Sequence, residues 1–148
     1  MLAHRAKIYL SQLNYLQLMI TENEDTIKEL EASMYRLGAL SGSEITSGSI
    51  PDCAAYARIY EKLAMKRSEA AERICEYVER QELIINQIKG LENTNYAALL
   101  YKRYVQFKSL VRISEEMNYT YDYIREIHGK ALDDFALKYN IPQKPTFE

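Results

Sequence analysis

The chain has 148 residues, of which 47% are hydrophobic and 27% charged, so its composition excludes a disordered polypeptide and fits one ordinary domain or two small modules. Its formal net charge is only −2, so no global field attracts nucleic acid or an anionic membrane, and such a partner requires a local surface. No apolar run approaches the ~20 residues that cross a bilayer. We therefore expect a cytoplasmic protein with no membrane partner.

The first predicted helix covers residues 5–37. From Ala6 onward, apolar residues recur at alternating steps of three and four, which is the heptad pattern of a helix that packs against another helix. The stripe consists of Tyr9, Leu13, Leu16, Ile20, Ile27, Leu30, Met34 and Leu37, with Asn23 as its polar interruption. Gly38 follows the last periodic residue, so we expect the helix to end there and residues 38–51, rich in Gly and Ser, to form a loop.

A second long helix is predicted over residues 52–90. Its stripe consists of Cys53, Tyr56, Tyr60, Leu63, Ala70, Ile74, Tyr77, Ile84, Ile88 and Leu91, interrupted at Arg67 and Gln81. Cys53 and Cys75 would lie roughly 33 Å apart on this helix and could not pair, which is typical of a reducing compartment. Two long helices joined by a loop predict a coiled-coil-like antiparallel helical hairpin, formed by residues 1–92.

Residues 93–141 predict a separate small module of shorter helices. Ser109 and Thr120 can cap two of them, and Asn118 stands at the turn between, where Asn tolerates a left-handed backbone. The inward positions are Leu99, Leu100, Tyr104, Leu110, Ile113, Met117, Ile124, Ile127 and Leu132. The fold class is therefore all-α, with the hairpin followed by a helix-turn-helix and its support helix, and residues 142–148 form a tail.

The residues predict neither an enzyme nor a metal or cofactor site. His4 and His128 are the only histidines, neither has a second ligand at metal-binding spacing, and no Gly-rich phosphate loop occurs. Tyr121 and Tyr123 fall on the face of the last helix opposite Ile124 and Ile127. Together with Arg125 and Lys130 they are candidate contacts for nucleic acid, the alternative being tyrosines packed against the hairpin.

The run LLYKRYVQFKSLVRISEEMNYTYDYIREIHGKALDDF resembles region four of bacterial sigma factors, which reads promoter DNA. The shared pattern is a Leu-rich support helix ending in Arg-Tyr, Ser-Leu opening the next helix, a turn, and a recognition helix ending in Lys-Ala-Leu. With its long helices, the whole chain is similar to the late-gene transcription regulators of the ArpU and RinA type, found in phages and prophages of Gram-positive bacteria.

This resemblance implies a sequence-specific regulator that binds double-stranded DNA in the cytoplasm of a bacterial host. The hairpin would serve self-association as a homo-oligomer, or contact with RNA polymerase. The implied site comprises Thr120 as helix cap and phosphate contact, Tyr121, Asp122 and Glu126 as readers of base edges, and Tyr123, Arg125 and Lys130 as backbone contacts. Lys108 and Arg112 would help to offset the repulsion between the two acids and the phosphates.

Two residues depart from the sigma pattern. Phe107 stands where the related proteins usually have Gly, and Ser114 where Ala is usual. Phe107 would either pack against the hairpin or mark a protein-binding surface, whereas Ser114 can hydrogen-bond back along its helix. Two alternatives stay open: a DNA-packaging oligomer similar to a small terminase, and a protein–protein adaptor whose helix-turn-helix is degenerate.

Overall fold

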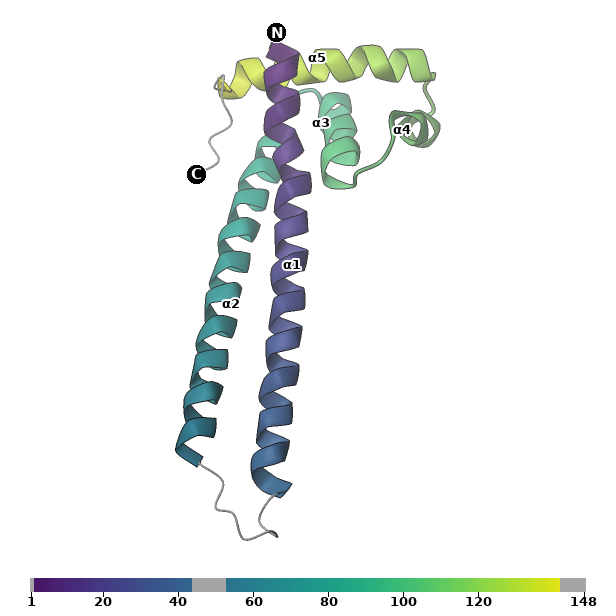
Figure 1. Cartoon of the computed structure of the whole chain (residues 1–148). Helices are drawn as coiled ribbons and strands as arrows, with labels where there is room; N and C mark the ends of the chain where they lie inside the picture. Colours follow the sequence, from purple (N-terminus) through teal and green to yellow (C-terminus); the bar gives the residue numbers. More distant parts are fainter. Residues whose placement is uncertain (1, 44–52, 142–148) are drawn as a thin grey trace. The chain divides into compact units, whose positions relative to one another are not determined.

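The structure, a computed structural model, describes residues 2–43 and 53–141. Its elements are α1 (Leu2–Ser43), α2 (Cys53–Lys89), α3 (Thr94–Leu100), the π-helix η1 (Tyr101–Val105), α4 (Leu110–Met117) and α5 (Tyr121–Tyr139) (Figure 1). These residues contain no β-strand, and the predicted all-α class is confirmed. No helix within the described ranges has an apolar stretch long enough to cross a membrane.

The bounds of the long helices differ from the prediction mainly at the end of α1. This helix continues through Gly38 to Ser43, so the expected helix end at Gly38 is wrong. A single glycine inside a helix costs only about 1 kcal/mol, which the helix-forming residues around it can outweigh. The rest of the predicted loop, residues 44–51, lies outside the described residues, whereas α2 begins and ends within one residue of its predicted bounds.

The chain divides into two compact units, and the division is not the predicted one after residue 92. One unit, here called the two-helix unit, is Leu18–Val78; the other, the mixed unit, joins Met1–Gln17 with Glu79–Glu148. The first turns of α1 and the last turns of α2 belong to the mixed unit because they pack on α5. The Tyr9 ring lies 5.9 Å from the Phe135 ring, and the Tyr139 hydroxyl donates a 2.6 Å hydrogen bond to the Gln87 carbonyl.

Within the two-helix unit, the paired segments of α1 and α2 run antiparallel. Arg73 Nε donates to Asn23 Oδ1 at 3.0 Å, while further along α1 Glu31 pairs with Arg67 at 3.8 Å, nearer the start of α2. Asn23 is buried at a stripe position because both ends of its amide are satisfied, the Nδ2 group donating to the Met19 carbonyl at 2.7 Å.

The predicted stripes are buried or half-buried wherever the structure describes their side chains, with one exception. Tyr60 is 46% exposed, so its expected burial is wrong. A pair of helices covers only a narrow seam, and a side chain as large as tyrosine extends beyond it. The side chain of Cys53 lies outside the described residues, and Cys75 is an exposed free thiol.

The mixed unit has a core to which several elements contribute. Leu99, Ile113, Ile124 and Ile127 form a buried cluster that joins α3, α4 and α5, and Tyr96, Leu110 and Met117 pack against it. Every inward position predicted for the C-terminal module is buried or half-buried, so these predictions are confirmed. Leu10 and Phe135 are also fully buried, although the sequence patterns had not singled them out.

Candidate functional site

Helices α4 and α5 each follow a residue whose side chain caps the helix N-terminus. Ser109 Oγ accepts a hydrogen bond from the Arg112 amide at 3.2 Å, and Thr120 Oγ1 accepts one from the Tyr123 amide at 3.2 Å. Between the helices, Asn118 has φ 59° and ψ 40°, a left-handed conformation that ends α4. Both predicted caps and the predicted turn are confirmed. Because each depends on neighbours within three residues, sequence alone was sufficient to find them.

The outer face of α5 carries Asp122, Arg125 and Glu126, all exposed, and is opposite to Ile124 and Ile127 in the core. Glu126 is not an isolated acid, because its Oε1 lies 3.1 Å from the Lys130 ammonium one turn further along. The hydrogen bond to Glu126 is the main cause of a raised pKa at Lys130. Two members of the predicted site therefore neutralise each other on the surface of α5.

The two tyrosines at the start of α5 lie outside the core. Tyr121 is 44% exposed and Tyr123 is 46% exposed. The Tyr123 ring also contacts Tyr119, with ring centroids 4.9 Å apart, a contact that the helical period could not predict because Tyr119 precedes α5. The pair forms an aromatic surface beside the turn, next to the capping residue Thr120.

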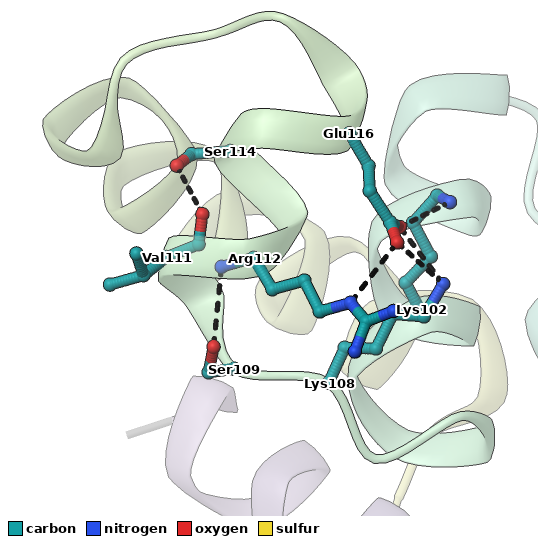
Figure 2. A network of polar contacts seen from close by, with 7 residues as sticks. All are labelled: Lys102, Lys108, Ser109, Val111, Arg112, Ser114 and Glu116. Atoms are coloured by element: carbon teal, nitrogen blue, oxygen red, sulfur yellow. Dashed lines mark hydrogen bonds and ion pairs between the residues drawn. The ribbon is translucent and has the colours of Figure 1, made fainter.

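The Glu116 carboxylate on α4 contacts three cationic side chains, one from η1, one from the following loop and one from α4 itself (Figure 2). Glu116 accepts a 2.9 Å hydrogen bond from Lys102 Nζ of η1 and another of 2.9 Å from Lys108 Nζ of the following loop. Arg112 Nε, one turn earlier on α4, lies 3.4 Å from Glu116 Oε1. The hydrogen bond from Lys102, followed by that from Lys108, lowers the pKa of Glu116 to about 2.

This cation cluster, defined as Lys102, Lys108 and Arg112, changes the interpretation of two predicted residues. Lys108 and Arg112 had been expected to offset the negative charge of the acids on α5, but both form ion pairs with Glu116. Neither Lys102 nor Glu116 was among the residues that the sequence predicted for the site. The four-residue spacing of Arg112 and Glu116 was a visible signal. Lys102 carried none, because it lies 14 positions before Glu116 and only the turn between η1 and α4 brings it close.

The Arg-Tyr pair at the end of the support segment attaches it to both following elements. Arg103 Nη1 donates to the Lys108 carbonyl at 3.0 Å, and a 3.0 Å hydrogen bond joins Tyr104 Oη to His128 Nε2 on α5. Burial raises the pKa of Tyr104 to about 12 and, with the nearby charges of Arg103 and Lys7, lowers that of His128 to about 4. At neutral pH both rings are therefore uncharged, and the hydrogen bond joins two neutral side chains.

The two departures from the sigma pattern have different structural consequences. Ser114 is buried, and its hydroxyl donates to the Val111 carbonyl at 2.6 Å, so the expected bond back along the helix is confirmed (Figure 2). Phe107 has φ 56°, a left-handed conformation that glycine adopts without strain, and its side chain is 47% exposed. The glycine that is usual here in the sigma pattern is therefore explained by the left-handed backbone of the turn before α4.

Among the described residues, no group of three or more His, Cys, Asp or Glu side chains is arranged to hold a metal ion. Comparisons with protein-family models, with curated proteins and with solved structures found no match to the chain.

Proposed function

We propose that the chain is a sequence-specific, DNA-binding transcription regulator in which α4 and α5 act as a helix-turn-helix and α5 enters the major groove. The observation that carries the proposal is the capped α4–turn–α5 pair. Its inner faces share one apolar cluster, and its outer face on α5 stays exposed. In proteins of this class, the second helix reads base edges and the first crosses the DNA backbone.

The side chains on α5 suit two kinds of contact. Arg125 is an exposed cation that fits a phosphate, and Thr120 at the helix N-terminus offers a hydroxyl for the same purpose. Asp122 and Glu126 can accept a hydrogen bond from a cytosine amino group. The ion pair of Glu126 with Lys130 is exposed, so it contributes little stability and can be exchanged for a base and a phosphate.

The long helices supply a candidate surface for assembly. Leu18 on α1 and Met65 on α2 are large apolar side chains that are more than half exposed. Single exposed apolar side chains are ordinary on a protein surface, so these two are compatible with an assembly surface but do not by themselves mark one. In the proposed function, an antiparallel helical hairpin made by α1 and α2 mediates self-association or contact with RNA polymerase.

One observation favours a second candidate function, a protein adaptor that docks on polymerase without reading DNA. Phe107 is 47% exposed and Val111, at the start of α4, is 54% exposed. Apolar side chains near the first helix would weaken a contact with phosphates and strengthen one with a protein.

The first test selects duplexes from a random pool and compares two arginine variants by titration at several salt concentrations. Arg125→Ala should weaken binding to all duplexes and reduce the salt slope by about 0.9, the value for one phosphate contact. Arg58→Ala is the matched control, because it removes the same charge from an exposed position of α2. Equal behaviour of the two variants would contradict the role of α5.

The second test concerns base recognition by Glu126. Glu126→Ala should relax preference at one base pair, with a discrimination loss of about 1–3 kcal/mol. Retained DNA binding by every α5 variant, together with reduced association with polymerase, would favour the adaptor. Mass measurement of the free protein completes the comparison, since a ring of many copies would favour the packaging alternative.

A further inference from the structure

The cation cluster has more positive charge than its carboxylate can balance. Lys102, Lys108 and Arg112 are three cations, and Glu116 is the one acid that they share. Two positive charges remain within hydrogen-bonding distance of a single carboxylate. Such an arrangement attracts a second anion, because the repulsion among the cations is only partly relieved.

The cluster is also accessible to an anion from solvent. The Arg112 side chain is 67% exposed, and about a quarter of the Glu116 side chain is exposed. Lys102 and Lys108 are more covered, with 27% and 20% of their side chains exposed, and their ammonium groups both point to the carboxylate (Figure 2). A phosphate that approaches Arg112 would meet the lysines by taking the place of Glu116.

The place of the cluster in the fold indicates which anion it would meet. Lys108 immediately precedes the cap Ser109, and Arg112 lies in the first turn of α4. The first helix of a helix-turn-helix crosses the DNA backbone, where phosphate oxygens are the only anions. Carboxylate and phosphate oxygens accept the same charge-assisted hydrogen bonds, so one can replace the other.

We propose that Lys102, Lys108 and Arg112 form a phosphate-binding site for the backbone of duplex DNA, and that Glu116 is its internal counter-ion. This inference rests on the proposed function, and it adds a role for Lys102 and Glu116. With Glu116 in place, the cluster contributes less to non-specific affinity. Sequence preference then depends more on the base contacts of α5.

The test compares two acid-to-amide variants of the full-length protein on one selected duplex and one scrambled duplex. Glu116→Gln should raise affinity for both by on the order of fivefold to tenfold at 0.1 M salt and steepen the salt slope by about 0.9. Glu115→Gln is the matched control, since it changes the same charge at the adjacent exposed position, outside the cluster. An equal effect of the two variants would overturn the inference.

A second pair of variants guards against a change of fold. In the double variant Glu116→Gln/Lys102→Gln, the affinity gained through Glu116→Gln should be largely lost. The reason is that Lys102, one of the cations that Glu116 no longer pairs with, has been removed. Arg112→Gln, at an exposed side chain, should lower affinity for both duplexes and reduce the slope by about 0.9. Circular dichroism must match the parent for each variant. If Glu116→Gln unfolds, Arg112→Gln decides alone, and an unchanged slope overturns the proposal.

The Arg125→Ala variant, measured in parallel, separates the two possible failures. If Arg125→Ala weakens binding while Glu116→Gln and Glu115→Gln behave alike, the proposed function stands and the counter-ion role fails. If the parent protein binds no duplex at low salt, the proposed function fails, and this inference fails with it.

Discussion

The two-helix unit and the mixed unit of this chain are held together in different ways. In the two-helix unit, α1 and α2 bury one stripe along each helix, and polar contacts between the helices include Arg73 with Asn23 and Arg67 with Glu31. In the mixed unit, one buried cluster takes residues from α3, α4 and α5, and the ends of both long helices pack on α5 as well.

This difference predicts in which unit a buried polar substitution lowers the free energy of unfolding more. A stripe position in a helix pair has neighbours on one side only, so solvent can reach a new polar group placed there. A cluster position in the mixed unit is enclosed by several elements, so a charged side chain placed there cannot be hydrated. Damage should therefore be greater in the mixed unit for the same chemical change.

The largest expected effect is that of Ile127→Asp on α5. Ile127 is 6% exposed within the cluster, so an aspartate there should destabilise the protein by about 4 kcal/mol or more and remove DNA binding. Leu137→Asp is the control, because Leu137 is 68% exposed on the same helix and should change stability by less than about 1 kcal/mol. Denaturant unfolding followed by circular dichroism measures both, and similar losses would refute the enclosed cluster.

The same charge in the two-helix unit should do less. Leu30 is only half-buried, so Leu30→Asp should cost about 1–3 kcal/mol, whereas Glu29→Ala next to it should cost almost nothing. The measurement is again denaturant unfolding, with helical content at low denaturant as a second readout. A loss for Leu30→Asp that exceeds that of Ile127→Asp would reverse the comparison of the units.

Two glycines test the packing of α2 against α5 in the mixed unit. A Cβ at Gly90 would lie 2.5 Å from the Tyr139 hydroxyl, which already bonds to the Gln87 carbonyl, so Gly90→Ala should destabilise by about 1–2 kcal/mol. At Gly129, in the middle of α5, a Cβ meets nothing within 4 Å, and Gly129→Ala should stabilise by about 1 kcal/mol. Changes of the same sign in thermal melting would show that α5 does not pack on α2 as described.

Between about pH 4 and 6.5, the pH dependence of stability should come mainly from His128 in the mixed unit. Its pKa is lowered from 6.5 to about 4, so the unfolded chain takes up a proton at a higher pH than the folded chain does. The contribution of neutral His128 to the free energy of unfolding is therefore fully present above about pH 6.5 and is lost as the pH falls toward 4. His128→Gln should flatten the dependence in that window. His4→Gln, at an exposed residue, should leave it unchanged, and a parent curve that is already flat would contradict the burial of His128.

The smallest expected effect is that of Phe107→Gly. Relief of the left-handed strain and the greater entropy of glycine in the unfolded chain oppose each other, so stability should change by less than about 1 kcal/mol, toward greater stability. Val111→Gly, at an exposed position inside α4, should instead destabilise by about 1 kcal/mol. A thermal melt of each variant is sufficient, and a clear loss at Phe107→Gly would mean that its side chain contributes more than its backbone costs.

Sequence alone determined the features that depend on neighbours within about one helical turn. The caps Ser109 and Thr120, the turn at Asn118 and the buried stripes belong to this group, because a side chain bonds its own backbone or repeats with the helical period. The exposure of Arg125 was predictable for the same reason, whereas Tyr121 and Tyr123 stand three and four residues before Ile124 and Ile127, beside the buried face, and their exposure was not. The end of α1 was not, since a glycine favours a helix end without requiring one.

Tertiary structure decided which distant side chains meet. It joined the start of α1 and the end of α2 to α5, through Tyr9 with Phe135 and Gln87 with Tyr139, and so moved the division of the chain away from residue 92. It also placed Lys102 against Glu116 and gave Lys108 and Arg112 a partner outside α5. A periodic pattern specifies which face of a helix is buried, but it does not specify the partner helix. That choice depends on how the elements pack together in three dimensions.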